Sequence, residues 1–322
     1  MMAQGVFYFW LVLNFLLLFY VSMEFILLLF AVFSKKRPEA KVLEDCPTVC
    51  IQLPIYNEKY VVERLIDVVC KMDYPKDKLE IQVLDDSTDE TVERAGKIIQ
   101  EKQNQGFRIE HVRRADRSGF KAGALDYGLG RTNAEFIAIF DADFLPDKNF
   151  LMATLPHFSR DNVGVVQSRW AHTNDGFSFL TKAQAIMLNT HFSVEQLGRN
   201  KSGAFINFNG TAGIWRKSCI EDAGGWTADT LTEDLDLSFR AQLKGWSFNY
   251  LYDVESPAEL PVTLDAYKTQ QYRWSKGAAE CIRKNMRDLW SSKASLWAKL
   301  AGTVHLSNSS VYIVVLLLVI TS

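Results

Sequence analysis

The sequence has few cysteines and no excess of either charge sign, and each shortage excludes a class of protein. The chain of 322 residues contains 36 Lys and Arg against 38 Asp and Glu, a formal charge of −2. Nucleic-acid-binding domains usually have a clear basic excess, so no nucleic-acid partner is expected. The five cysteines are odd in number and form no C-x-x-C pair. This pattern argues against a disulfide framework and a zinc site, and favours a reducing compartment.

The N-terminus contains a long apolar run. From Val6 to Phe33 its clear polar interruptions are Asn14, Ser22 and Glu24, and roughly 20 apolar residues suffice to cross a bilayer. A secretory signal peptide would have a shorter apolar core behind a basic residue. Cationic residues follow the run at 35–37, and such flanks stay cytoplasmic. We therefore expect residues 1–34 to be a transmembrane anchor and 35–47 a cytosolic linker.

The C-terminus is apolar for about ten residues after Ser310, which is too short to span a membrane. A buried strand or helix would also explain this run. We interpret residues 301–322 as the start of a second transmembrane helix that is cut off partway. On this interpretation the chain is a piece of a longer polytopic protein.

Between these ends, apolar strand-like runs alternate with helical stretches. The runs are 48–53, 79–84, 107–112, 135–140 and 163–168, with helices expected from Glu58 to Met72 and from Asp89 to Lys102. This alternation predicts an α/β fold with a mostly parallel sheet covered by helices. Ligands of such sheets bind beyond the carboxyl ends of the strands.

Acidic residues follow two of these predicted strands. The second strand runs into Asp85–Asp89 and the fourth into Asp141 and Asp143. Helix capping and turn formation are the alternative explanation, particularly for the first group. Two carboxylates that leave a buried strand together repel each other unless a cation or donor lies between them. Hard oxygen ligands of this kind suit Mg²⁺ or Mn²⁺, typically shared with substrate phosphates.

Six motifs then occur in a fixed order, and together they resemble the inverting family 2 glycosyltransferases. Their order and the longer runs around them are most similar to the processive cellulose synthase-like branch, in particular the A and C proteins that make mannan or glucan backbones. The resemblance covers about residues 48–290. The motifs are Gln52–Glu58, Asp85–Asp89, Lys121–Leu125, Asp141–Asp143, Thr232–Asp234 and Gln270–Trp274.

The resemblance implies a GT-A type domain over 48–255 that binds a nucleotide sugar. It places the donor on seven residues of the first four motifs. Tyr56 offers a face for stacking on the base, Asp85 or Asp86 can accept a hydrogen bond from it, and Lys121 can meet a phosphate. Asp143, with Asp141, would hold the metal, which neutralises charge on the leaving diphosphate. The donor set is Pro54, Tyr56, Glu58, Asp85, Asp86, Lys121 and Asp141.

The same resemblance assigns the catalytic and acceptor residues. Asp234 would be the general base that deprotonates the acceptor hydroxyl, although capping of a helix is the alternative role. Arg273 would pair with the diphosphate, and Trp274 would offer a platform to a sugar ring. Residues 256–300 would form amphipathic helices at the membrane surface. The remaining acceptor contacts would be Gln270, Phe208, Asn209, Gly210 and Thr211.

These observations predict an integral membrane enzyme with a cytosolic catalytic domain, in a plasma or Golgi membrane. We expect it to transfer a hexose from GDP-mannose or UDP-glucose, with inversion, to the non-reducing end of a β-1,4-linked polysaccharide. Transfer of one sugar to a lipid, such as ceramide or a polyprenyl phosphate, is the first alternative. A catalytically silent scaffold in an export complex is the second. Lipids of the membrane are expected partners, whereas self-association and export partners stay open.

Overall fold

Within residues 2–322, which the computed structural model describes, the strands form one seven-stranded sheet. Its order is β3-β2-β1-β4-β6-β5-β7. The first four neighbours run parallel, β6 is antiparallel to both β4 and β5, and β7 is parallel to β5. The expected mostly parallel sheet is therefore confirmed. The strands are β1 (Val49–Ile55), β2 (Leu79–Asp85), β3 (Arg108–Val112), β4 (Phe136–Ile139), β5 (Val163–His172), β6 (Gly213–Arg216) and β7 (Ser247–Ala258).

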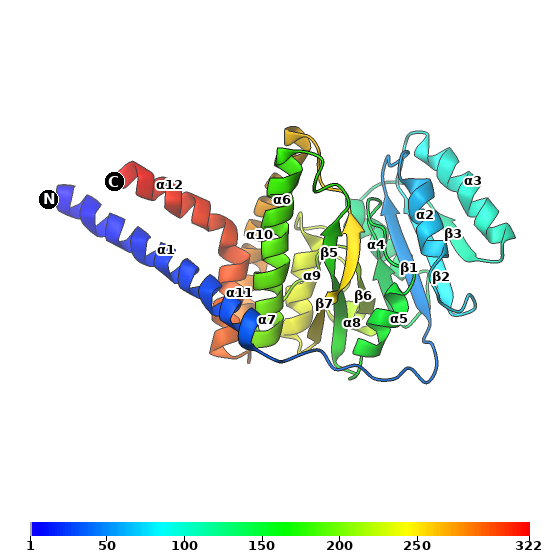
Figure 1. Ribbon diagram of the computed structural model, residues 1–322, viewed down its shortest axis with the longest axis horizontal. Coiled ribbons are helices and arrows are strands. Elements are labelled where there is room, and N and C mark those ends of the chain that lie inside the picture. The colour runs from blue at the N-terminus through cyan, green and yellow to red at the C-terminus, as the bar shows by residue number, and fades with distance from the viewer. Residues whose placement is uncertain (1) are drawn as a thin grey trace.

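Helices cover both faces of this sheet (Figure 1). Alternate side chains of a strand point to opposite faces, so Ile51 packs in one buried cluster with α2 and α3, whereas Cys50 packs in another with α4. The helices are α2 (Val62–Cys70), α3 (Thr91–Asn104), α4 (Phe120–Leu129), α5 (Phe150–Thr154), α6 (Phe179–Thr190), α7 (Leu197–Ser202), α8 (Lys217–Asp222), α9 (Glu233–Leu243) and α10 (Leu264–Ser291). Short 3₁₀ turns are η1 (Leu155–His157) and η3 (Asn308–Ser310), and η2 (His191–Gln196) is a π-helical turn.

The five strands expected from the sequence all form, but two helices begin later than expected. The helix expected from Glu58 starts at Val62 because Asn57 adopts a left-handed conformation with φ of 58°. The helix expected from Asp89 starts at Thr91, whose backbone N–H donates to Asp89 Oδ1. Strands β6 and β7 were not expected. With β5, they form the half of the sheet beyond β4.

Two apolar helical segments project together from one side of the domain (Figure 1). The segments Gln4–Phe33, within α1 (Met2–Phe33), and Leu296–Thr321 are long and apolar enough to cross a membrane. The second comprises α11 (Leu296–Ser307), η3 and α12 (Val311–Thr321), so it begins earlier than the expected residue 301. The Tyr20 hydroxyl joins the two segments through the Ser307 and Ser310 hydroxyls, at 2.7 and 2.9 Å.

The base of α1 is fixed to the domain. Lys201, at the end of α7, donates from Nζ to the Ala31 carbonyl at 2.7 Å. A carbonyl in the last turn of a helix has no partner within that helix, so this bond satisfies it. A Cβ at Gly198 would lie 2.4 Å from the Leu27 carbonyl oxygen, which shows how closely α7 approaches α1.

Candidate active site

The expected acidic residues lie at one edge of the sheet, where three parallel strands end. β1, β2 and β4 are neighbours and run in the same direction, so their carboxyl ends bring Tyr56, Asp85 and Asp141 to the same edge. Hydrogen bonds join the loops after β1 and β2: Asn57 N donates to Ser87 Oγ at 2.9 Å, and Thr88 N donates to Asn57 Oδ1 at 3.0 Å. These two bonds hold the loops after β1 and β2 together at this edge.

Lys121 lies at the centre of the edge. Its Nζ is 2.5 Å from Asp141 Oδ1 and donates to the Gly210 carbonyl at 2.9 Å. Asp141 is held in turn by its own backbone N–H, which donates to Thr211 Oγ1 at 2.8 Å. The start of α4, the end of β4 and the loop before β6 therefore meet on one ammonium group.

The start of α9 closes the same cluster. Gly210 has a φ of 80°, in the left-handed region that favours glycine, and a Cβ there would lie 3.1 Å from Asp234 Oδ2 and 3.6 Å from Lys121 Nζ. A side chain at this position would therefore press on Asp234. Gly210 therefore lies between the acid of the Thr232–Asp234 motif and Lys121, which are 113 positions apart in the sequence.

The acidic side chains of this cluster raise one another's pKa, because a nearby negative charge makes ionisation less favourable. Burial and the neighbouring Asp141 raise the pKa of Asp143 to about 7. Burial and Glu233 raise the pKa of Asp234 to about 7. Burial opposes the charge of Lys121 as well, but the carboxylates of Asp141 and Glu233 outweigh it and raise the pKa of Lys121. One ammonium group therefore faces more acids than it can neutralise.

This excess of carboxyl groups fits a divalent cation. Asp141 and Asp143 supply hard oxygen atoms at i and i+2 on the edge that Lys121 shares. Among the residues that the structure describes, no group of three or more His, Cys, Asp or Glu is arranged to hold a metal. A cation here would therefore take its other ligands from substrate phosphates and water, as Mg²⁺ commonly does in phosphate sites.

The predicted nucleotide side contains more paired groups than the sequence suggested. Asp85 Oδ2 lies 2.8 Å from His111 Nε2, and its Oδ1 accepts from Ser87 N at 2.8 Å. Burial opposes the charge of Asp85, yet these hydrogen bonds lower its pKa. Tyr56 is 39% exposed, and the Arg117 guanidinium lies 3.3 Å from its ring centroid. One face of Tyr56 is thus already covered by a cation.

Asp86 braces a loop. It accepts two hydrogen bonds from Arg114, at 3.0 and 2.5 Å. The same guanidinium donates to the carbonyls of Ser118 and Phe120. Asp86 therefore fixes the segment that leads into Lys121.

The other expected donor residues differ in position. Glu58 lies in the loop after β1, where burial and the charges of Asp141 and Asp89 raise its pKa. Pro54 lies within β1, half-buried and paired with Leu84, so its position supports the strand end rather than the cluster itself.

On the expected acceptor side, the loop 208–211 is held mainly by its own contacts. Phe208 is fully buried, with its ring centroid 5.5 Å from that of Trp215. Its side chain therefore belongs to the core, and the expectation that it contacts an acceptor needs this correction. Asn209 N donates to the buried Gln167 Oε1 at 3.0 Å, and Thr211 is buried beneath Asp141. Of this loop, Gly210 borders the cluster most closely.

The Gln270–Trp274 motif lies in α10, as expected. Gln270 and Trp274 are partly buried, and Trp274 packs against the core cluster of the sheet. Arg273 is exposed, and its charge lowers the pKa of Glu233, although burial, the larger effect, leaves that pKa raised.

Sequence reasoning missed four residues of this edge: His111, Arg114, Arg117 and Glu233. The basic run at 113–117 was the available signal for the two arginines, since it directly precedes the Lys121 motif. His111 had no such signal because it lies inside β3. Its proximity to Asp85 depends on the pairing of β2 with β3.

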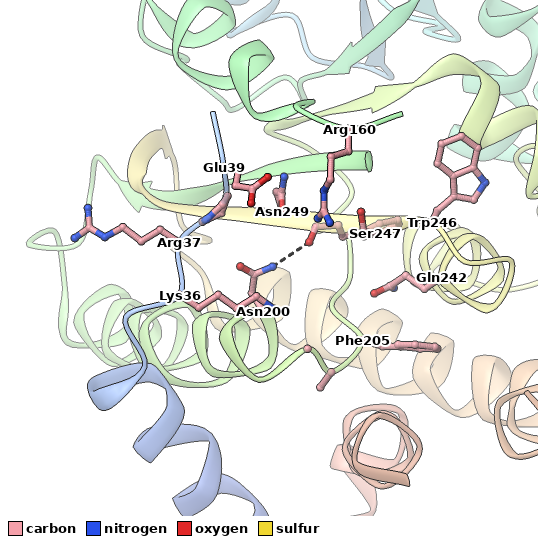
Figure 2. A pocket seen from close by; sticks show the side chains of 14 residues that line it. Lys36, Arg37, Glu39, Arg160, Asn200, Phe205, Gln242, Trp246, Ser247 and Asn249 are labelled. Atoms are coloured by element: carbon pink, nitrogen blue, oxygen red, sulfur yellow. Dashed lines mark hydrogen bonds between the residues drawn. The ribbon is translucent and has the colours of Figure 1, made fainter. Parts of the chain in front are cut away.

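A cavity of about 400 Å³ lies away from this edge (Figure 2). Its lining includes Lys36, Arg160, Asn200 and Trp246, together with the start of β7. Because it adjoins the amino-terminal end of β7, it lies at the sheet edge opposite Asp141. The cavity is therefore separate from the candidate active site.

Comparison with known proteins tests the resemblance. The model of a family described as "Glycosyltransferase like family 2" matches residues 47–277. The chain belongs to glycosyltransferase family 2. A probable glucomannan 4-beta-mannosyltransferase 7 from Oryza sativa subsp. japonica is 45% identical over 260 residues, which are 79% of this chain and 44% of that protein. Glucomannan 4-beta-mannosyltransferase 2 from Arabidopsis thaliana is 42% identical over 79% of this chain and 48% of that protein.

The family 2 chain therefore spans about half the length of these curated relatives. The expected cellulose synthase-like relationship is confirmed by their similarity. Among solved structures, the mannosyltransferase PcManGT from Pyrobaculum calidifontis, in complex with GDP-Man and Mn²⁺, has a TM-score of 0.75 at 22% identity. The match covers 99% of this chain and 84% of that one. S. aureus TarS 1-349 with UDP-GlcNAc has a TM-score of 0.59 at 18% identity, over 81% and 73%. These likenesses support the GT-A type fold.

Proposed function

We propose that this family 2 chain is the catalytic part of a membrane-bound β-1,4-mannosyltransferase that extends a mannan or glucomannan with mannose from GDP-mannose. The observation that supports it most is the cluster of Lys121, Asp141, Asp143 and Asp234 at the carboxyl edge of the sheet. The similarity to glucomannan 4-beta-mannosyltransferases favours mannose over glucose among the donors that the sequence left open. One fold neighbour, the mannosyltransferase PcManGT, was solved in complex with GDP-Man and Mn²⁺, which agrees with this choice.

In this proposal, one set of residues binds the metal and the diphosphate of the donor, and another set binds its base. Asp141 and Asp143 would hold Mg²⁺ or Mn²⁺, which neutralises the charge that develops on the leaving diphosphate. Lys121 and Arg273 supply further positive charge beside the same acids. Tyr56, with Arg117 already over one face, offers a stacking surface for the base, and the Asp85–His111 pair lies at the neighbouring strand end.

Asp234 is the group that accepts the proton of the acceptor hydroxyl in this proposal. The hydroxyl oxygen forms a bond to the anomeric carbon while the bond from that carbon to the phosphate oxygen breaks, and the electron pair leaves with GDP. The hydroxyl proton passes to Asp234. Because one displacement takes place, the anomeric centre inverts, and an α-linked donor gives a β-linked product. A pKa near 7 suits a general base in neutral cytosol.

The membrane arrangement is part of the proposal. The two apolar segments would cross the bilayer, and the cationic residues 35–37 would keep the domain in the cytosol. Protease treatment of sealed, right-side-out vesicles should leave the domain intact, and opening the vesicles should expose it. Glycosylation at Asn209, within an N-x-[ST] sequon, would contradict this topology.

The activity can be tested with membranes that contain the whole protein. Labelled GDP-mannose and UDP-glucose are supplied separately with Mn²⁺ or Mg²⁺, and the products are sized and digested with β-mannanase or β-1,4-glucanase. We expect mannanase-sensitive polymer from GDP-mannose, and none from membranes with Asp234→Asn. Polymer from UDP-glucose alone would contradict the donor assignment. A single sugar on an organic-soluble lipid would instead support the alternative of transfer to a lipid.

A further inference from the structure

We propose that one face of α10 holds the segment 227–236, which contains the general base, in its working position. Gly277, Glu280 and Lys284 are then positioning residues for sugar transfer. The inference rests on the proposed function, in which Asp234 accepts the acceptor's proton. It concerns residues of α10 beyond the Gln270–Trp274 motif.

The closest approach between the two elements is at Gly277. A Cβ at this position would lie 2.5 Å from both Cγ2 and Oγ1 of Thr232, so the site has room for glycine alone. Thr232 directly precedes the acids of the motif. One turn further along α10, Cys281 Sγ lies 3.5 Å from Thr232 Oγ1. The residue before the acids is therefore held between two residues of α10.

Hydrogen bonds extend this contact on both sides of Thr232. Glu280 Oε2 accepts the backbone N–H of Leu231 at 2.7 Å. Lys284 Nζ donates to Thr227 Oγ1 at 3.1 Å and lies 2.8 Å from Asp229 Oδ1. A single ammonium thus joins two points of the loop that leads into α9.

The same face also holds α9 itself, through Asp236. The Asp236 side chain has no exposed surface. Lys284 Nζ lies 2.9 Å from its Oδ2, and Asn285 Nδ2 donates to its Oδ1 at 3.0 Å. Arg240 also donates to Oδ2, at 2.8 Å, from within α9. Asp236 follows Asp234 by two positions, about 200° around the helix, so it faces α10 while Asp234 faces the sheet edge.

The spacing of these contacts places them on one stripe. Positions 277, 280, 281, 284 and 285 follow the i, i+3, i+4, i+7, i+8 rule for one helix face. Gln270, Arg273 and Trp274 continue the same stripe toward the start of α10, which is one helix of 28 residues. The helix that presents the expected acceptor-side residues therefore also fixes the base, so the two parts of the site are positioned by one rigid element.

The central test compares Lys284→Met with Arg283→Met. Arg283 is the adjacent cation and is exposed, with no ion pair or hydrogen bond among the residues that the structure describes, so its substitution removes the same charge from the outer face. In membranes of the whole protein, we expect Lys284→Met to lower kcat about 10- to 100-fold, the effect of a misplaced catalytic group, with GDP-mannose affinity changed less than about twofold. Arg283→Met should match the natural protein in both measurements.

A second pair of variants, at Glu280, tests the contact between α10 and Leu231 without changing the ion pairs of Lys284. Glu280→Gln keeps an oxygen that can accept from Leu231 N, whereas Glu280→Ala removes it. We expect Gln to retain most of kcat and Ala to lose it, while both bind GDP-mannose normally. Donor binding also shows whether each variant is folded, and Lys284→Arg, which keeps the cation, should recover part of the lost rate. If Lys284→Met misfolds, the Glu280 pair decides the question.

The outcomes separate this inference from the proposed function. If the natural protein transfers sugar and Lys284→Met equals Arg283→Met, or Glu280→Ala equals Glu280→Gln, the positioning role is wrong and the function stands. If the variants lose donor binding together with kcat, α10 supports the fold as a whole and the inference also fails. If the natural protein transfers no mannose from GDP-mannose, the proposed function itself is wrong.

Discussion

Asp234→Asn should produce a protein that is more stable than the natural one and that transfers sugar far more slowly. Asp234 lies beside Gly210 at the start of α9, and burial with the neighbouring Glu233 raises its pKa from 3.8 to about 7. An acid with a raised pKa in the folded state makes folding less favourable once it is charged. That penalty is absent below pH 3.8, grows as the pH rises toward 7, and is constant above it.

The size of the effect follows from the pKa difference. A change of about three in pKa corresponds to about 4 kcal/mol, which is an upper bound for removal of the charge. Asp234 retains partial exposure, and solvent screening reduces such effects, so a gain of about 1–2 kcal/mol is expected above pH 7. For a domain of this size, that gain corresponds to a rise in Tm of about 2–8 °C. Loss of a general base lowers the rate about 10²–10⁴-fold.

The assay is thermal unfolding of the purified protein in detergent, without metal or nucleotide, from pH 5 to pH 8.5, together with sugar transfer in membranes. The stability advantage of Asp234→Asn should be largest at pH 8.5 and shrink as the pH falls toward 5. A variant less stable at pH 8.5 than the natural protein would refute the burial argument. Near-normal transfer would refute the role as base, and loss of GDP-mannose binding would move Asp234 to the donor site.

Other substitutions test the remaining parts of the site. Asp143→Asn should weaken Mn²⁺-dependent GDP-mannose binding by about tenfold or more, measured by calorimetry; unchanged binding would argue against a metal ligand at this position. Gly210→Ala should cost about 1–2 kcal/mol of stability from its left-handed φ and, through its contact with Asp234, lower kcat more than donor affinity. Equal loss of both would contradict that division. Arg114→Met should free the loop that Asp86 braces and raise the KM for GDP-mannose with little change in kcat, whereas an unchanged KM would show that the loop holds itself.

The long apolar helix at the N-terminus and the first strands could be predicted from local pattern. No other segment of the sequence is both as long and as apolar as the run that ends at Phe33. The acids after β2 and β4 also followed from local order, because buried parallel strands must place their carboxyl ends at one edge of the sheet. The limits of these predictions were positional: α2 begins at Val62 because the left-handed Asn57 delays it.

Roles within the site were less predictable because each depends on contacts between distant segments. Asp86 appears in the sequence beside Asp85 as an equal candidate for the nucleotide, yet its pairing with Arg114 makes it a brace for the loop before Lys121. Phe208 lies in a motif that resembles an acceptor loop, but its ring packs on Trp215. Arg114 lies 28 positions beyond Asp86. Trp215 is only seven positions beyond Phe208, but it lies in β6, and the core that both rings enter forms only when β6 pairs with β4 and β5.

By itself, then, the sequence determined the alternation of strands and helices, the apolar N-terminal helix, and the acids at the ends of two strands, because these depend on periodicity over short stretches. The tertiary structure decided which groups meet. The strand order puts β6 beside β4, and this pairing brings the Gly210 carbonyl to Lys121 and the start of α9 to the same edge. The packing of α10 on the segment 227–236 was also invisible in the sequence, because a helical face records what is buried but not which segment covers it.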